Sequence, residues 1–302
     1  MKLFIIGNGF DIGHGLPTRY WDFRNYLKIM YPNFSRNFEE HYYIYPSMSD
    51  KEKSNLLWNE LESNLANINE DVIIEDGVSI EMNLESGDVG IEDTLYAYFS
   101  EEYSYINLLT KYLKQWIRTI KIRDTPKKSS LITNSAVYIT FNYTAVLENV
   151  YDIPPQNITH IHGSLREYDI DPVLGHGNND RIERIHEKIE EAERLFDEKK
   201  ISICRVVENY YRTTYKNVSR YTGALSKLHN IPIDGIYVIG HSLAGVDKEY
   251  FRCIDDLTNN TLIWKVFYYD TNEIEKLQSN LLGSGIDISR IKMIPSSEFY
   301  DL

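Results

Sequence analysis

The sequence has few cysteines and lacks long apolar runs, and these shortages exclude several classes of protein. Only 2 of its 302 residues are cysteine, Cys204 and Cys253. They cannot supply a four-cysteine zinc site, and they do not indicate a disulfide scaffold. No run approaches the ~18 apolar residues of a membrane-spanning helix, and the N-terminal apolar run is too short for a signal peptide. We therefore expect a cytoplasmic protein without a membrane span.

Positive charge is also scarce in this chain. Lysine and arginine total 32 residues against 45 aspartate and glutamate residues, which gives a formal net charge of −13. Proteins that bind nucleic acid through their overall field are basic, so we do not expect general nucleic-acid binding. The same acidity disfavours adsorption to anionic membrane surfaces.

The chain does contain short apolar runs that alternate with amphipathic helical patterns. The apolar runs predict strands at residues 2–7, 136–141, 158–162, 235–240, 262–268 and 291–294. Helical spacing predicts helices at residues 19–30, 50–69, 92–122, 142–150, 180–200, 201–229, 246–257 and 272–281. This alternation is typical of an α/β fold with a Rossmann-like, mostly parallel sheet and helices on both faces.

We expect a single Rossmann-like domain over residues 1–302. Helical insertions are expected at about 20–125 and 165–230, because the helices there look like additions to one core. We interpret residues 32–48 as irregular and residues 70–92 as a loop or hairpin. Ligands of open α/β sheets bind beyond the carboxyl ends of the strands, so the residues that follow each strand are the candidates for a site.

A glycine-containing loop, Gly7-Asn8-Gly9-Phe10-Asp11, follows the first predicted strand. Glycines let the backbone approach a phosphate closely with its N–H groups directed at it. The spacing is not Gly-x-Gly-x-x-Gly, and no ribose-binding acid follows about 20 residues on, which argues against an ordinary dehydrogenase. A glycine-rich turn with structural Asn and Asp caps is the alternative interpretation.

Asparagine and histidine side chains follow the next two strands. Asn142 offers a donor and an acceptor, although it would also serve as a cap for the next helix. Strand alternation predicts that His160 and His162 share one face. His162 lies directly before Gly163 and is a candidate general base, with a structural role as the alternative. A metal pair is less favoured because nearby carboxylates lack ligand spacing.

The strand at 235–240 ends in Gly240-His241-Ser242, a pattern similar to the Gly-x-Ser-x-Gly loop of serine hydrolases, with Ala244 in place of the final glycine. An α/β-hydrolase needs its histidine downstream of the serine, and no histidine follows His241. The required order fails, and contacts to a ribose or phosphate fit these residues better.

Together these four ordered motifs resemble the AbiH family of bacterial phage-defence (abortive infection) proteins, from residue 3 to about 251. The residues that carry the resemblance are Gly7–Asp11, His14–Pro17, Asp22, Phe23, Phe141–Thr144, Leu147, Glu148, His160–Gly163, Leu174–His176, Ile239–Leu243 and Asp247. More distantly, the series is similar to the sirtuin NAD-binding core. Thr144 stands where sirtuins have Asp and the zinc ribbon is absent, so a protein deacylase is not implied.

The resemblance implies a sirtuin-like NAD glycohydrolase that acts as an antiphage effector, with NAD as substrate, no metal, and Asn142 and His162 as catalytic residues. The residues expected to contact NAD are Gly7, Asn8, Gly9, Phe10, Asp11, His14, Gly240, His241, Ser242 and Asp247. Candidate partners are a phage-derived activator, a partner defence protein and further copies of the chain. Two alternatives stay open: a non-catalytic NAD or ADP-ribose sensor, and a metal-dependent nuclease that uses His160, His162 and His176.

Overall fold

The computed structural model describes most of the chain and divides it into two compact units. The described residues are 1–79, 96–97, 100 and 105–301. The sheet unit comprises residues 1–23, 113–173 and 217–302, and the helical unit comprises residues 24–112 and 174–216. Both stretches of the helical unit fall within the insertions that we expected, while a single domain over the whole chain stays a prediction.

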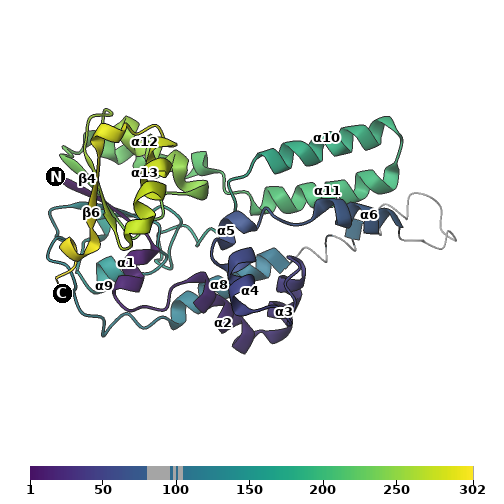
Figure 1. Cartoon of the computed structure of the whole chain (residues 1–302), viewed down its shortest axis with the longest axis horizontal. Helices are drawn as coiled ribbons and strands as arrows, with labels where there is room; N and C mark the ends of the chain where they lie inside the picture. Colours follow the sequence, from purple (N-terminus) through teal and green to yellow (C-terminus); the bar gives the residue numbers. More distant parts are fainter. Residues whose placement is uncertain (80–95, 98–99, 101–104, 302) are drawn as a thin grey trace. The chain divides into compact units, whose positions relative to one another are not determined.

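Six parallel strands form the sheet unit, in the order β3-β2-β1-β4-β5-β6 (Figure 1). The strands are β1 (Lys2–Ile6), β2 (Val137–Thr140), β3 (Ile158–His160), β4 (Gly235–Ile239), β5 (Trp264–Tyr268) and β6 (Ile291–Pro295). Each lies within or overlaps a predicted strand, and the fully parallel pairing confirms the Rossmann-like α/β expectation. The strand order reverses direction between β1 and β4, which is the place where doubly wound sheets bind ligands.

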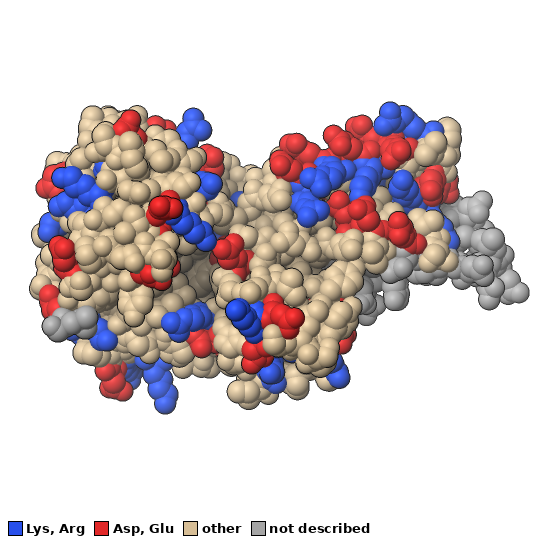
Figure 2. Space-filling model, in the orientation of Figure 1, with Lys and Arg blue, Asp and Glu red and all other residues tan. Residues whose placement is uncertain are grey.

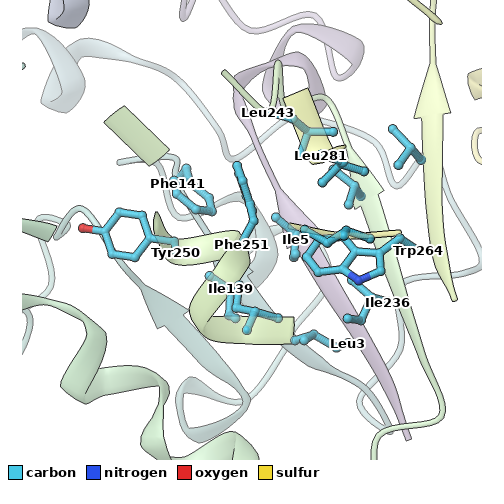
Figure 3. Packing of buried hydrophobic residues seen from close by; sticks show 14 of the residues in the cluster. Leu3, Ile5, Ile139, Phe141, Ile236, Leu243, Tyr250, Phe251, Trp264 and Leu281 are labelled. Atoms are coloured by element: carbon cyan, nitrogen blue, oxygen red, sulfur yellow. The ribbon is translucent and has the colours of Figure 1, made fainter. Parts of the chain in front are cut away.

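Strand alternation builds a core on each face of this sheet. On one face, Leu3 and Ile5 pack with α12 (Lys248–Leu257) and α13 (Ile274–Leu282), as Figure 3 shows around Phe251 and Trp264. On the other face, Phe4 and Ile6 pack with α1 (Asn8–Gly13) and α9 (Val146–Asn149). Every residue of β1 from Leu3 to Ile6 is buried. The carboxyl end of β1, from which the loop Gly7–Asp11 starts, is therefore fixed in the core.

The helical unit contains α3 (Pro32–Glu40), α4 (Asp50–Lys53), the π-helix η1 (Ser54–Trp58), α5 (Leu61–Asn64), α6 (Glu70–Ser79), α10 (Asp180–Arg194) and α11 (Glu198–Thr214). Two further helices, α2 (Tyr20–Met30) and α8 (Tyr105–Thr119), continue from one unit into the other. In Figure 1, α10 and α11 run side by side as a hairpin. Among the described residues, no helix is both long and apolar enough to span a membrane.

Acidic and basic side chains alternate over the α10–α11 surface, as Figure 2 shows. They form exposed pairs, such as Arg205 on α11 with Glu193 on α10. Pairs of this kind contribute little stability, because both charges remain in water. We therefore attribute the charge of this hairpin to a solvent-facing surface.

Several helix predictions need correction. The helix predicted at 50–69 begins with a Ser49 capping box, but a π-helical turn and a break at Glu60 interrupt it. The adjacent Leu57 and Trp58 of that turn are both buried. The helix predicted at 201–229 spans Glu198–Thr214 instead, and shorter 3-10 helices follow, including η4 (Thr222–Asn230).

The irregular and loop assignments also fail in part. Residues 32–40 form α3, which begins with proline and buries Phe38. Residues 70–79 form α6, although strong sequence signals for it are few. Residues 80–92 lie outside the described residues, as does most of 92–104 of the long helix predicted at 92–122.

Candidate functional site

The loops that follow β1 and β4 touch through their backbones. The Gly7 N–H donates to Ile239 O at 3.0 Å, and the Gly9 N–H donates to Gly240 O at 2.8 Å. A Cβ atom on Gly9 would lie 2.6 Å from Gly240 Cα, and Gly240 has a left-handed φ of +65°. Glycine is thus required for the two loops to meet. Since the Gly7 and Gly9 amides already have acceptors, a diphosphate would need other groups of this loop.

The first loop also holds the end of β2 through a buried carboxyl. Asn142 Nδ2 donates to Asp11 Oδ1 at 2.9 Å and to Gly7 O at 3.1 Å. Thr144 Oγ1 donates to Asp11 Oδ2 at 2.6 Å. Both amide protons of Asn142 are used, so its side chain has one orientation and its Oδ1 is the atom that would accept from a ligand. We call Asp11, Asn142 and Thr144 the Asp11 cluster.

Burial dominates the electrostatics of the Asp11 cluster. Asp11 is 1% exposed, and burial raises its pKa to about 7, although the hydrogen bonds from Thr144 and Asn142 oppose the shift. A carboxyl group in water has a pKa near 4. Asp11 therefore exchanges a proton close to neutral pH, a behaviour that is concentrated at functional sites.

A second network supports the same strand ends from β3. His160 Nδ1 lies 3.0 Å from Asn142 O, and its Nε2 lies 2.9 Å from Glu148 Oε1. Arg166 Nη1 also donates to Glu148 Oε1, at 2.9 Å. Burial raises the pKa of Glu148, but His160 and Arg166 outweigh it and the pKa ends below its usual value. The two His160 nitrogens face the Asn142 carbonyl and the Glu148 carboxylate. The His160 ring therefore links the Asn142 backbone to Glu148.

His162 belongs to a different group. Its Nε2 lies 3.0 Å from Asp247 Oδ1, while His241 Nε2 lies 3.4 Å from Asp247 Oδ2. The Phe141 ring packs edge-on against both imidazoles, with ring centroids 5.0 Å from His162 and 4.4 Å from His241. Tyr250 lies beside Phe141 (Figure 3). We call His162, Asp247 and His241 the His–Asp–His group.

The prediction that His160 and His162 share one strand face is wrong. β3 ends at His160, and the chain turns at Gly163, which has a left-handed φ of +81°. The two rings therefore reach different carboxylates. Phe141 contacts the His162 ring and directly precedes Asn142, whose carbonyl faces His160, so the two groups are neighbours at the end of β2.

Four predicted NAD-contacting residues belong to neither of these two groups. His14 is buried, with Nδ1 2.7 Å from Phe10 O and Nε2 2.7 Å from Tyr151 Oη, and burial lowers its pKa. Phe10 is part of the apolar core. Asn8 Nδ2 donates to Thr18 O, and Ser242 is exposed, with its carbonyl accepting from Asn280.

Sequence patterns had given no chemical role to Thr144, Glu148, Arg166 or Phe141. Their roles depend on contacts across 12 to 133 residues of chain, such as Glu148 with His160 and Thr144 with Asp11. The one available signal was the polar segment after β2. That segment identified Asn142, but it could not show that Thr144 contacts Asp11 or that Glu148 contacts His160.

The third histidine of the nuclease alternative, His176, lies in the helical unit. Its Nδ1 accepts from the Asn178 N–H at 3.1 Å, and burial lowers its pKa to about 4. Across the described part of the chain, no three His, Cys, Asp or Glu side chains are grouped so that they could hold a metal ion.

Comparison with known families gives a match. The family described as bacteriophage abortive infection AbiH matches residues 3–268. The matched range contains the whole Asp11 cluster and the whole His–Asp–His group. None of the curated proteins matches the chain.

Proposed function

The chain belongs to the AbiH family of bacteriophage abortive infection proteins, and from this premise we propose that it is a sirtuin-like NAD glycohydrolase whose activity carries out that role. The substrate is proposed from the similarity of the ordered motifs to the sirtuin NAD-binding core. The products are nicotinamide and ADP-ribose. Loss of NAD in an infected cell would stop phage replication together with cell growth.

The fixed orientation of Asn142 is the observation that carries this proposal. Its amide is locked by Gly7 O and Asp11 at the carboxyl edge of the sheet. That edge is where doubly wound folds bind nucleotides. An amide oxygen that is held in one direction is suited to orient a water molecule or a ribose hydroxyl, because no rotamer freedom is lost on binding.

The proposed chemistry needs few groups. Water forms a bond to the ribose C1′, the C1′–N bond to nicotinamide breaks, and its electron pair leaves with the nicotinamide nitrogen. Neutral nicotinamide is a good leaving group, so a strong acid is not required. The proton of the attacking water passes to His162, a general-base contribution of about 10²–10⁴-fold.

The remaining contacts follow from the loops around the two groups. Gly240, His241 and Ser242 would bound the adenosine side, and the first loop would line the diphosphate side. Asp11 lies behind Asn142, and its carboxyl would act through that amide rather than by touching NAD. Asp247 faces the imidazoles of His162 and His241.

Nicotinamide release from NAD tests the proposal. Purified protein, alone and with lysate from phage-infected cells as activator, is incubated with NAD and the products are separated. We expect His162→Ala and Asn142→Ala each to lower the rate by about 10²-fold or more, while the exposed His229→Ala control keeps it. The proposal is wrong if wild type releases no nicotinamide under either condition, or if both variants match wild type. Tight NAD binding without release would instead indicate the sensor alternative.

A further inference from the structure

Asp247 has an unusual position between two histidine rings. Its two carboxylate oxygens face the Nε2 atoms of His162 and His241, at 3.0 and 3.4 Å. All three side chains are largely buried, with 4%, 6% and 14% of the His162, His241 and Asp247 side chains exposed. Asp247 lies directly before α12, while the two histidines follow β3 and β4, so three separate segments converge on this carboxylate.

The loop after β4 determines which proton His241 carries. The Leu243 N–H donates to His241 Nδ1 at 2.9 Å, so Nδ1 must hold a lone pair. The proton of the neutral ring is then on Nε2 and is directed at Asp247. Left-handed backbone at Gly240 and Leu243 turns this loop back on itself and allows the bond. His241 is therefore built to donate to the carboxylate and not to receive a proton at Nδ1.

His162 meets the other oxygen of the carboxylate. Its Nε2 lies 3.0 Å from Asp247 Oδ1, a contact that becomes an ion pair when the ring is protonated. We propose that Asp247 is a positioning residue that holds the His162 ring and stabilises the imidazolium formed during the reaction. This inference rests on the proposed function, since it assigns the partner of the proposed base.

The proton balance is simple. As water adds to C1′, its proton moves to the neutral His162 imidazole, and the imidazolium that forms is paired with the Asp247 carboxylate. The carboxylate does not become protonated, as in other carboxylate–histidine pairs. Titratable groups beside His162 include Asp247 and, from α12, Tyr250, whose ring centroid lies 5.6 Å away, and His241 lies on the other oxygen of Asp247.

The pH dependence of turnover separates this role from a structural one. Asp247→Asn keeps the size of the side chain but removes its charge. We expect kcat to fall by about 10²-fold or more, with the Kd for NAD nearly unchanged. The acidic limb of the pH–rate profile should also move to lower pH, because the imidazolium loses its counter-charge. Asp270→Asn is the matched control, since Asp270 precedes the helical segment after β5 but is exposed and contacts Asn272.

A second measurement does not depend on turnover. The ring-proton chemical shifts of His162 are followed by NMR as a function of pH in wild type and Asp247→Asn. A midpoint that moves to lower pH in the variant supports the inference even if the wild-type protein releases no nicotinamide, in which case only the proposed function fails. An unchanged midpoint, or a reduced kcat with an unchanged pH profile, overturns the inference.

His241→Asn covers the case in which Asp247→Asn does not fold. This variant removes the donor to Asp247 and leaves the carboxylate in place. We expect a smaller loss of kcat, within about 10–100-fold, with a change in the pH profile. If His241→Asn has the kcat and the pH–rate profile of the wild-type protein, the inferred role of Asp247 between the two histidines is overturned.

Discussion

The two units bury charged groups in different ways. In the helical unit, Arg24 donates from Nε and Nη2 to the two carboxylate oxygens of Glu39, at 2.5 and 3.2 Å. In the sheet unit, the direct donors to the buried Asp11 carboxyl are neutral, the Asn142 amide and the Thr144 hydroxyl. The first arrangement compensates charge with charge. The second does not, and burial raises the pKa of Asp11 to about 7.

This difference separates groups that support the fold from groups that fit a site. A buried pair with matched charges stabilises one conformation, and its loss is costly wherever it lies. A buried carboxyl with a strongly raised pKa reduces stability at neutral pH, and such groups are concentrated at functional sites. We therefore interpret the Arg24–Glu39 pair as structural and the Asp11 cluster as functional.

Breaking the pair in the helical unit should have the largest effect on stability. Arg24→Met leaves the buried Glu39 carboxylate without this cation, and we expect the free energy of unfolding to fall by about 3–5 kcal/mol. Urea unfolding followed by circular dichroism measures it. Arg205→Met, in an exposed pair with Glu193, should change it by no more than about 1 kcal/mol. Equal losses in the two variants would contradict a structural role that depends on burial.

The Asp11 carboxyl should make stability depend on pH. Because its pKa is higher in the folded chain than in the unfolded chain, its contribution is present below about pH 4 and is lost as the pH rises through about 7. Asp11→Asn removes this titration. Relative to the variant, wild type should lose roughly 4 kcal/mol of unfolding free energy between about pH 4 and pH 8. Parallel pH curves for the two proteins would show that Asp11 is not buried as a titrating group.

Disrupting the contact between the loops after β1 and β4 should have an intermediate effect on the free energy of unfolding. Gly9→Ala puts a Cβ atom 2.6 Å from Gly240 Cα, where only backbone could move. We expect a loss of about 1–3 kcal/mol in unfolding free energy and weaker NAD binding. Gly223→Ala is the control, because a Cβ there meets nothing within 4 Å among the described residues. If Gly9→Ala behaves like Gly223→Ala in both measurements, the two loops are not in direct contact.

Removal of one donor from the Asp11 cluster should have the smallest effect. Thr144→Val keeps the shape and removes a hydrogen bond that lowers the pKa of Asp11, so that pKa should rise further. We expect a cost of about 1 kcal/mol at neutral pH, measured by thermal unfolding. Thr159→Val tests β3, where the buried hydroxyl has no hydrogen-bond partner among the described residues, and it should cost less. A larger cost for Thr159→Val would contradict this ranking.

Sequence patterns predicted the sheet well and the helical unit less well. Short apolar runs such as residues 2–7 and 235–240 became β1 and β4, because strands buried on both faces are apolar throughout. Residues 70–79 became α6 although strong sequence signals for it are few. Contacts from other parts of the helical unit stabilise that helix, including those of the buried Glu70 with Lys188 and Tyr211. Such contacts cannot be read from local spacing.

The candidate site shows the same limit. Gly7, Asn142 and Gly240 were identified because each follows a strand, and the carboxyl ends of parallel strands share one edge. The separation of His160 from His162 depended on the end of β3 and the turn at Gly163, which a period of two residues does not predict.

Hydrolysis of NAD in ¹⁸O-labelled water, with nicotinamide and ADP-ribose measured together by mass spectrometry, tests the proposed site most directly. We expect the wild-type protein to form the two products in equal amounts, with ¹⁸O in the ADP-ribose. Asn142→Ala and His162→Ala should form far less of both. Intact NAD after incubation with wild type, both alone and with lysate from phage-infected cells, would contradict the assignment of this sheet edge as an NAD-cleaving site.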